Sequence, residues 1–212
     1  MRSNVTSCSA WRLYAILDPS AMRSGDLIDL AAAAIRGGAD VLQLRHKTAS
    51  AFELLSYALR LLPMTRAARI PLIINDRADV AHAAGADGVH LGQDDLPLKA
   101  AREILGAQAL IGLSTHSLEQ ALVARDAGAD YIGLGPIFPT PTKPDDGSVG
   151  LALIGHVRSR VQLPTVCIGG IDQTNLPEVV HAGANCVAVV RAIGHAADPE
   201  SATRDLKHLL VQ

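Results

Sequence analysis

Residues 72–95 read LIINDRADVAHAAGADGVHLGQDD, and this stretch decides the fold class. A short apolar run at 72–74 stops at the polar residues Asn75 and Asp76. An alanine-rich helical pattern follows and ends near Gly85, and a second apolar run at 89–91 stops shortly before Asp95. The order strand, helix, strand is typical of a unit in which two parallel strands are joined by a helix.

The same unit recurs along the chain. GGAD at 37–40, AGAD at 84–87 and at 127–130, and AGAN at 182–185 each follow a helical pattern and precede a β-type run. The glycine suits the end of a helix, where a left-handed backbone is needed. Further β-type runs alternate with these, so that strands are predicted at residues 13–17, 41–44, 72–74, 88–91, 110–113, 131–134, 165–168 and 186–190.

Strands and helices that alternate in this way over 212 residues favour an α/β fold, a single-domain (β/α)8 TIM barrel. The alternative is a doubly wound open sheet, but no G-x-G-x-x-G motif follows the first strand. No linker or shift in composition divides the chain. We therefore expect a flexible N-terminus at residues 1–10 and one catalytic barrel domain at residues 11–212.

The composition limits the kinds of partner. A formal net charge of −2 gives no electrostatic reason to expect nucleic acid or a membrane surface, so small-molecule substrates are the expected partners. Cys8, Cys167 and Cys186 are odd in number and form no C-x-x-C motif, which indicates free thiols in a reducing compartment. No apolar run approaches the ~20 residues of a membrane span and no secretory signal is visible, so a cytoplasmic location is expected. A homo-oligomer is allowed, but the residues do not set the oligomeric state.

Two carboxylates follow consecutive predicted strands. Because the carboxyl ends of parallel strands meet at one end of a barrel, Asp76 and Asp95 are expected to face one ligand. Two carboxylates at one site are unfavourable unless a cation lies between them, and oxygen ligands favour Mg²⁺. The alternative for an aspartate after a strand is a helix N-cap that accepts backbone N–H groups.

Other strand ends carry cations and glycines. Alternation along the second strand places Gln43, Arg45 and Lys47 on one side, which predicts an anion site. Gly170 and Arg191, after the last two strands, fit the phosphate site that many barrels build there. His116 is a candidate general acid or base, whereas His90 is as well explained as a packed histidine. The irregular stretch at 136–150, PIFPTPTKPDDGSVG, is either functional or flexible.

Together these strand ends describe a site for a phosphate on one side and a metal-bound diphosphate on the other. Such a site suits displacement of diphosphate, since a metal ion and cationic side chains stabilise the charge of the leaving group. No nucleophile with an adjacent base can be identified from the order of the residues.

Seven motifs in this order resemble the thiamine-phosphate synthase family over about residues 13–193. They are QLRHK at 43–47, INDR at 74–77, GVHLGQDD at 88–95, GLSTH at 112–116, GLGPIFPTPTK at 133–143, IGGI at 168–171 and VVRAI at 189–193. Each motif is weak alone, but seven in order at predicted strand ends are specific.

The resemblance implies a transferase that joins a hydroxymethylpyrimidine diphosphate to a thiazole phosphate, giving thiamine phosphate and diphosphate. It implies a dissociative, Mg²⁺-assisted reaction, with the metal held by Asp76 and Asp95. The residues implied to hold the pyrimidine diphosphate are Gln43, Arg45, Lys47, Asn75, Ser114 and Lys143, of which Arg45, Lys47, Ser114 and Lys143 are the implied catalytic set. The residues implied at the thiazole phosphate are Thr140, Thr142, Gly170, Val190 and Arg191.

Three residues depart from the family pattern: His46 replaces a usual Glu, Arg191 a usual Ser, and Asn185 the Asp of the last repeat. The alternatives are a thiazole tautomerase of the same superfamily and a non-catalytic barrel that senses a phosphorylated ligand. Retention of Asp76, Asp95 and Lys143 favours the synthase, because a tautomerase has no diphosphate to bind. The residues leave open whether the thiazole carries a carboxylate.

Overall fold

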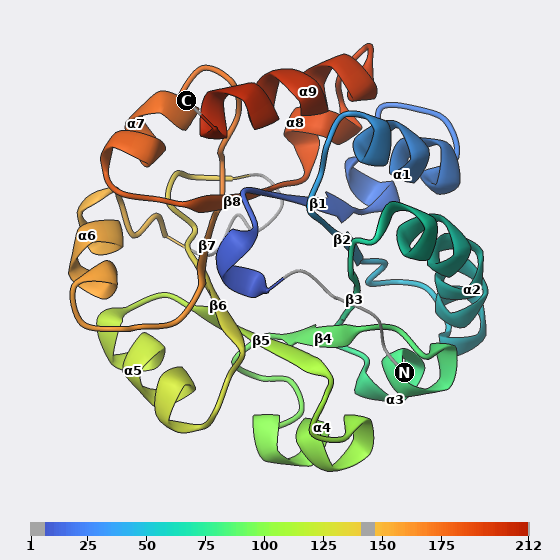
Figure 1. Cartoon of the computed structure of the whole chain (residues 1–212), viewed down its shortest axis with the longest axis horizontal. Coiled ribbons are helices and arrows are strands. Elements are labelled where there is room, and N and C mark those ends of the chain that lie inside the picture. Colours follow the sequence, from blue (N-terminus) through green and yellow to red (C-terminus); the bar gives the residue numbers. More distant parts are fainter. Residues whose placement is uncertain (1–6, 141–146, 212) are drawn as a thin grey trace.

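The computed structural model describes residues 7–140 and 147–211. In that part of the chain, eight parallel strands close into a barrel in sequence order, and β8 pairs back onto β1 (Figure 1). The strands are β1 Leu13–Leu17, β2 Val41–Leu44, β3 Leu72–Asn75, β4 Gly88–Leu91, β5 Leu110–Thr115, β6 Tyr131–Leu134, β7 Thr165–Ile168 and β8 Cys186–Val189. Closure confirms the TIM barrel and rules out the doubly wound sheet, which would leave two open edges.

The helices form a ring around the barrel (Figure 1). They are α1 Leu27–Arg36, α2 Ala51–Ala68, α3 Ala78–Ala84, α4 Leu98–Leu105, α5 Leu118–Asp126, α6 Ala152–Arg158, α7 Leu176–His181, α8 Arg191–Gly194 and α9 Pro199–Leu210. The last of these, α9, packs against α1 and completes the ring. Over residues 7–140 and 147–211, none of these helices combines the length and apolar character that crossing a membrane requires.

Three strand ends differ from the sequence prediction. β3 extends to Asn75, and β5 extends to Thr115 because Ser114 and Thr115 still pair with β6. β8 stops at Val189, since Val190 leaves the extended conformation at φ −117° and ψ −76° and begins α8. The longer strands carry Asn75 and Ser114 on rigid backbone at the end of the barrel, which fixes the direction of these side chains.

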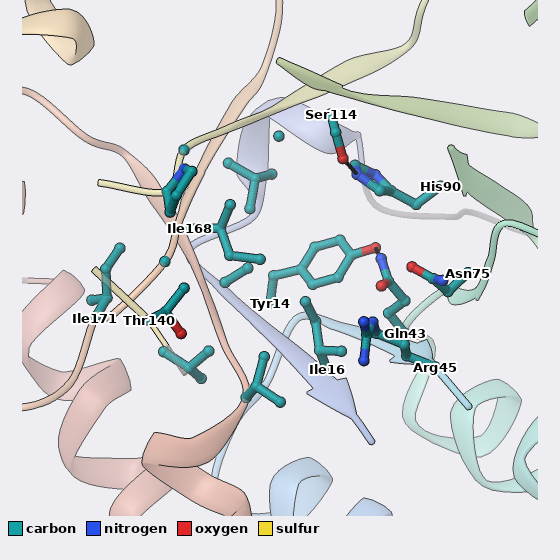
Figure 2. Close-up of a pocket in the computed structure, with 18 of the residues that line it drawn as sticks. Tyr14, Ile16, Gln43, Arg45, Asn75, His90, Ser114, Thr140, Ile168 and Ile171 are labelled. Atoms are coloured by element: carbon teal, nitrogen blue, oxygen red, sulfur yellow. Dashed lines mark hydrogen bonds between the residues drawn. The ribbon is translucent and has the colours of Figure 1, made fainter. Parts of the chain in front are cut away.

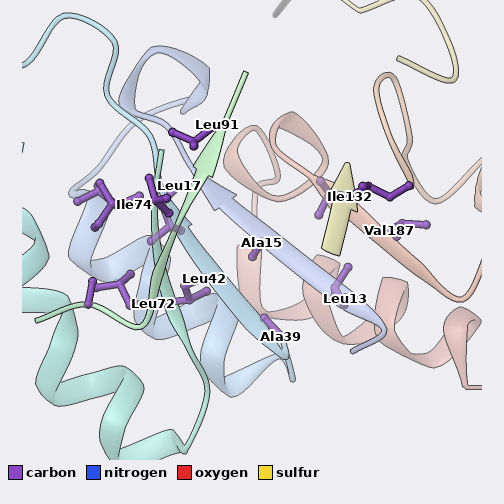
Figure 3. Packing of buried hydrophobic residues seen from close by; sticks show 14 of the residues in the cluster. Leu13, Ala15, Leu17, Ala39, Leu42, Leu72, Ile74, Leu91, Ile132 and Val187 are labelled. Atoms are coloured by element: carbon purple, nitrogen blue, oxygen red, sulfur yellow. The ribbon is translucent and has the colours of Figure 1, made fainter. Parts of the chain in front are cut away.

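The strands separate two apolar layers by their alternation. In β1, Leu13, Ala15 and Leu17 belong to the layer between the sheet and the helices (Figure 3). Tyr14 and Ile16 instead belong to a second cluster inside the barrel. The inner layer therefore decides what lies beneath any site at the carboxyl ends of the strands.

An aromatic cluster fills the amino-terminal end of the barrel. The Trp11 ring, 1% exposed, meets the Tyr14 and Tyr131 rings edge-on at centroid distances of 6.0 and 5.3 Å. Cys8–Ala10 form a 3-10 helix before it, seen in Figure 1 as the dark blue turn over the barrel. Flexibility of residues 1–10 stays a prediction, and residues 1–6 lie outside the described part of the chain.

The repeated glycines have the conformation that the sequence predicted. The second residue of each repeat has a positive φ, at Gly38 (96°), Gly85 (68°), Gly128 (84°) and Gly183 (104°). The alanine that follows each of them is buried. Each repeat therefore forms the loop that connects the end of a helix to the start of the next strand.

The aspartate of the repeat has a role that the pattern did not reveal. Its carboxylate accepts a hydrogen bond from a backbone N–H at the start of the previous strand, from Leu13 to Asp40 (2.9 Å), from Leu72 to Asp87 (2.9 Å) and from Ile111 to Asp130 (2.8 Å). These N–H groups lie where the ladder begins, so the carboxylates satisfy donors at the amino ends of β1, β3 and β5. Asn185, which departs from the pattern, is exposed at this same end and thus lies away from the site.

The cysteines are free thiols, as predicted, and Cys167 and Cys186 are buried. Burial raises the pKa of the Cys8 and Cys167 thiols to about 12. The reactive thiolate is therefore scarce at neutral pH, so these groups serve as packing rather than as nucleophiles.

Replacing one repeat aspartate should destabilise the barrel. Asp130→Ala removes the acceptor for the Ile111 N–H and the ion-pair partner of Arg102 (2.6 Å), so we expect the free energy of unfolding in urea to fall by about 1–3 kcal/mol. Asn185→Ala, at the matching but exposed position, should change it by less than about 0.5 kcal/mol. Equal losses in both variants would contradict the capping role.

Candidate active site

A cavity of about 460 Å³ opens at the carboxyl ends of the strands (Figure 2). The predicted site residues that line it are Gln43, Arg45, Lys47, Asn75, Asp76, Asp95, Ser114, Thr140, Gly170, Val190 and Arg191. Residues at or just after the carboxyl ends of β2 to β8 thus meet at one place, as their positions in the sequence predicted. Thr142 and Lys143 lie outside the described residues, and their predicted roles stay predictions.

Arg45 is held by a carboxylate that the sequence analysis missed. Its guanidinium forms an ion pair with Asp18, which follows β1 and is 2% exposed. The other oxygen of Asp18 accepts bonds from the Ser20 backbone N–H (2.9 Å) and hydroxyl (2.7 Å), so the carboxylate is fixed from both sides. A guanidinium has five N–H donors in one plane, and donors beyond the ion pair remain for a ligand. Asp18 therefore aims Arg45 at the cavity.

Lys47 forms an ion pair with Asp76, at the end of β3. Asp76 has a φ of +62°, a left-handed conformation that is uncommon outside glycine and is often found at functional sites. Its backbone N–H donates to the His90 carbonyl at 2.8 Å, which anchors this turn on β4. The N-cap alternative for Asp76 is wrong, because Arg77 occupies the N-cap of α3.

Asp76 and Asp95 act on each other electrostatically. Burial raises the pKa of the Asp76 carboxyl above its ordinary value, Lys47 lowers it, and the nearby Asp95 raises it again. Asp95 is itself held by the Gly92 backbone N–H at 2.6 Å. A carboxylate with a raised pKa beside a second carboxylate is a position that a cation would stabilise.

This pair of carboxylates fits Mg²⁺. Mg²⁺ is commonly bound by one or two protein carboxylates and completes its octahedron with waters and substrate phosphates. Within residues 7–140 and 147–211, no cluster of three or more His, Cys, Asp or Glu side chains forms a closed metal cage. The donor set is therefore that of an open site, where a phosphorylated ligand would supply the remaining oxygens.

The floor of the cavity is made of hydrogen-bonded polar side chains. The Gln43 amide donates to the Tyr14 hydroxyl at 2.8 Å, and the Ser114 hydroxyl lies 3.0 Å from Nε2 of His90 (Figure 2). His90, which the sequence left open between packing and function, therefore lines the cavity. Its ring faces inward because alternation along β4 turns Val89 and Leu91 toward the helices.

The opposite wall is built from backbone. Gly169 and Gly170 have φ values of 103° and 63° after β7, and the Gly170 carbonyl accepts from the Asn175 amide at 2.7 Å. A Cβ at Gly170 would lie 2.7 Å from the Pro139 carbonyl oxygen, so only glycine fits there. Val190 and Arg191 complete this wall at the start of α8. The wall is rich in backbone, and close approach of a ligand to backbone is what glycine allows.

The departures from the family pattern lie at different distances from this cavity. His46 is absent from the lining, and its ring packs near Tyr57 at a centroid distance of 6.2 Å. Arg191 lines the cavity, and its guanidinium lies 3.5 Å from Nδ1 of His195 one turn later. His46 is therefore a peripheral change, whereas Arg191 adds a cation to the wall that Gly169 and Gly170 form.

Sequence reasoning missed Asp18, Tyr14 and Tyr131, which also line or support the cavity. The tyrosines looked like strand residues of the core, and only the pairing of distant strands shows that they reach the site. Asp18 carried a signal, since it follows an apolar run as Asp76 does. His116, considered as an acid or base, bonds through Nδ1 to the Gly135 carbonyl and so braces the loop after β6.

The family model described as thiamine monophosphate synthase matches residues 13–193. The chain belongs to the thiamine monophosphate synthase family. It is 47% identical over 201 residues to the thiamine-phosphate synthase of Chloroflexus aurantiacus, covering 94% of this chain and 93% of that protein. It is 50% identical over 177 residues to that of Natronomonas pharaonis, covering 82% and 83%.

Solved structures agree with family membership. The thiamine phosphate pyrophosphorylase from Pyrococcus furiosus superposes with a TM-score of 0.89 at 35% identity, covering 97% of this chain and 98% of that one. A 3-hexulose-6-phosphate synthase at 20% identity shares the fold alone, with a TM-score of 0.66. The resemblance that the motifs indicated is confirmed, and neither the tautomerase nor the sensor alternative gains support.

Removing Asp18 should destabilise the thiamine monophosphate synthase barrel near the site. Asp18→Ala leaves the largely buried Arg45 guanidinium without its partner, so we expect the free energy of unfolding to fall by about 2–4 kcal/mol. Arg36→Ala breaks an exposed ion pair with Glu200 and should cost less than about 1 kcal/mol. Urea unfolding of both variants checks this, and similar small losses would contradict the anchoring role of Asp18.

Proposed function

We propose that this chain is a thiamine-phosphate synthase that joins a hydroxymethylpyrimidine diphosphate to a thiazole phosphate, with release of diphosphate. The observation that supports it best is the pair of cations, Arg45 and Lys47, each paired with a carboxylate at the mouth of one cavity. Such a mouth suits a polyanion that binds together with a metal ion, and a diphosphate leaving group is such a polyanion.

The residues divide between the two substrates. Arg45, Lys47 and Asn75 face the mouth beside Asp76, where the diphosphate would lie. Gly170 and the start of α8 form the opposite wall, where the thiazole phosphate would bind through backbone N–H groups and Arg191. The pyrimidine ring would then lie between them over Gln43 and Ser114, which places its reacting carbon toward the thiazole.

Mg²⁺, held by Asp76 and Asp95, would supply charge stabilisation at the diphosphate oxygens. The side chains do the remaining work. Lys47 can exchange Asp76 for a diphosphate oxygen, and Arg45 donates to a second oxygen while Asp18 keeps it aligned. The apolar side chains of Ile16 and Ile168, which also line the cavity, would limit water near a cationic intermediate, so that the thiazole nitrogen captures it. This dissociative order needs no protein nucleophile.

Several expectations from the sequence are compatible with this function and stay predictions. Absence of a nucleic-acid partner, a cytoplasmic location and an open choice between monomer and homo-oligomer stay predictions. The roles of Thr140, Thr142 and Lys143 in the loop after β6 also stay predictions. Whether the thiazole carries a carboxylate is decided by assay of both forms.

The reaction itself is the first test. Purified protein mixed with both substrates and Mg²⁺ should form thiamine phosphate, and EDTA should stop it. Asp76→Asn should lower kcat by about a hundredfold because a metal carboxylate is lost. Asp94→Asn, a neighbouring exposed aspartate that does not line the cavity, should leave kcat near that of the parent. Product formation unaffected by EDTA would contradict the metal-assisted reaction.

Arg191 gives a second test, specific to this chain. Arg191→Ser restores the usual residue and removes a charged donor, so KM for the thiazole phosphate should rise about tenfold. KM for the pyrimidine diphosphate should change little, because that substrate would bind at the other wall. Arg204→Ser on the exposed face of α9 serves as the control. An unchanged KM for the thiazole phosphate would mean that Arg191 does not bind its phosphate.

A further inference from the structure

A row of polar side chains crosses the barrel beneath the cavity and ends at Ser114. The Gln43 amide lies 2.8 Å from the Tyr14 hydroxyl, which lies 3.0 Å from the Tyr131 hydroxyl. That hydroxyl lies 3.1 Å from Nδ1 of His90, and Nε2 of His90 lies 3.0 Å from the Ser114 hydroxyl. Figure 2 shows the two ends of this row, with Gln43 beside Tyr14 and His90 beside Ser114.

The row is almost fully buried from Gln43 to Tyr131. Tyr14 is 1% exposed, Tyr131 is 0% exposed and Gln43 is 3% exposed. Burial raises the pKa of both phenols well above the ordinary value. Each tyrosine therefore keeps its proton and has one hydrogen bond to donate.

The Gln43 end sets the direction of donation. An amide NH₂ only donates, so Tyr14 accepts from Gln43 and its own proton is available for Tyr131. Tyr131, having accepted, donates to Nδ1 of His90. In the reverse direction Tyr14 would accept twice, and its own proton would need a third partner inside a closed barrel.

The direction at His90 follows from the hydrogen bond that its Nδ1 accepts. A ring that accepts at Nδ1 carries its proton on Nε2 and donates there. The Ser114 hydroxyl oxygen then accepts from His90, and its own proton turns toward the cavity. A serine whose oxygen accepts from His90 has its own proton available to donate, which suits an anionic ligand.

We propose that Tyr14, Tyr131 and His90 are positioning residues. Tyr14 and Tyr131 hold His90 as the Nε2–H tautomer, and His90 thereby makes Ser114 a hydrogen-bond donor toward the leaving diphosphate. The last step rests on the proposed function, whereas the tautomer of His90 does not. The donor is oriented before the substrate arrives, so no reorganisation is needed when charge develops on the leaving group.

The backbone is adapted to this row. A Cβ at Gly112 would lie 2.1 Å from Cζ of Tyr131 and 2.6 Å from Nδ1 of His90. A Cβ at Gly133 would lie 3.1 Å from Cε1 of His90. Both glycines occupy ordinary strand positions with no positive φ, so the space they leave explains them better than their backbone conformation does. The contact between Tyr131 and His90 depends on glycine at 112.

The tautomer can be measured in the ligand-free full chain by ¹H–¹⁵N correlation of the histidine rings, with the His90 signal assigned through His90→Gln. We expect an unprotonated Nδ1 and a protonated Nε2 in the parent protein. In Tyr131→Phe the donor to Nδ1 is lost, and a share of the His90 rings should shift to the Nδ1–H form. Tyr57→Phe, which removes a hydroxyl outside the row, is the matched control and should leave the signal unchanged.

An Nδ1–H tautomer at His90 in the parent protein would overturn the proposal, and this measurement needs no variant to fold. An unchanged tautomer in folded Tyr131→Phe would overturn it as well. The signals of the other histidines report whether each variant is folded.

Coupling between residues tests the link to catalysis. Tyr131→Phe should lower kcat about tenfold in the parent and much less in Ser114→Ala, because the row acts through that hydroxyl. Equal losses in both backgrounds would overturn the positioning role. A protein without synthase activity that still shows the Nε2–H tautomer would refute the proposed function and leave the hydrogen-bond row standing.

Discussion

The closure of the barrel is the constraint on which everything else depends. Pairing of β8 with β1 leaves no open sheet edge, so the side chains that point inward must fill a space of set width. In this chain the inward positions combine large aromatic rings with glycines. Gly112 lies against the rings of Tyr131 and His90, and neither ring could cross the barrel if a larger residue replaced it. The interior is therefore a packed support for the site above it.

The site is charged at its mouth and uncharged at its floor, because the floor is part of this packed interior. Arg45 and Lys47 lie at the ends of strands, where each finds a carboxylate, Asp18 or Asp76. Deeper in the barrel, the polar groups are amide, phenol, imidazole and hydroxyl, and hydrogen bonds join them in one row. The rim thus suits the anionic groups of a ligand, while the deeper, uncharged surface suits an uncharged ring.

The fold could be predicted from the sequence because three independent signals agreed. Short apolar runs, left-handed glycines after helices and polar strand ends all repeat in step, and the strands lie within two residues of their predicted ends. Their positions at or after strand ends bring Gln43, Arg45 and Asp95 to one cavity. What could not be predicted depends on register between distant strands. Tyr14 and Tyr131 are 117 residues apart in sequence, and nothing local to either indicates that their hydroxyls meet.

The aspartates at the amino ends of the strands show how the barrel is divided. Asp40 bonds to the start of β1, Asp87 to the start of β3 and Asp130 to the start of β5, so each carboxylate joins an odd strand to the even strand that follows. A chain break between β2 and β3 separates none of these partners, whereas a break between β1 and β2 parts Leu13 from Asp40. Pairs of strands, β1 with β2, β3 with β4 and β5 with β6, are therefore the smallest fragments of this barrel that keep these bonds.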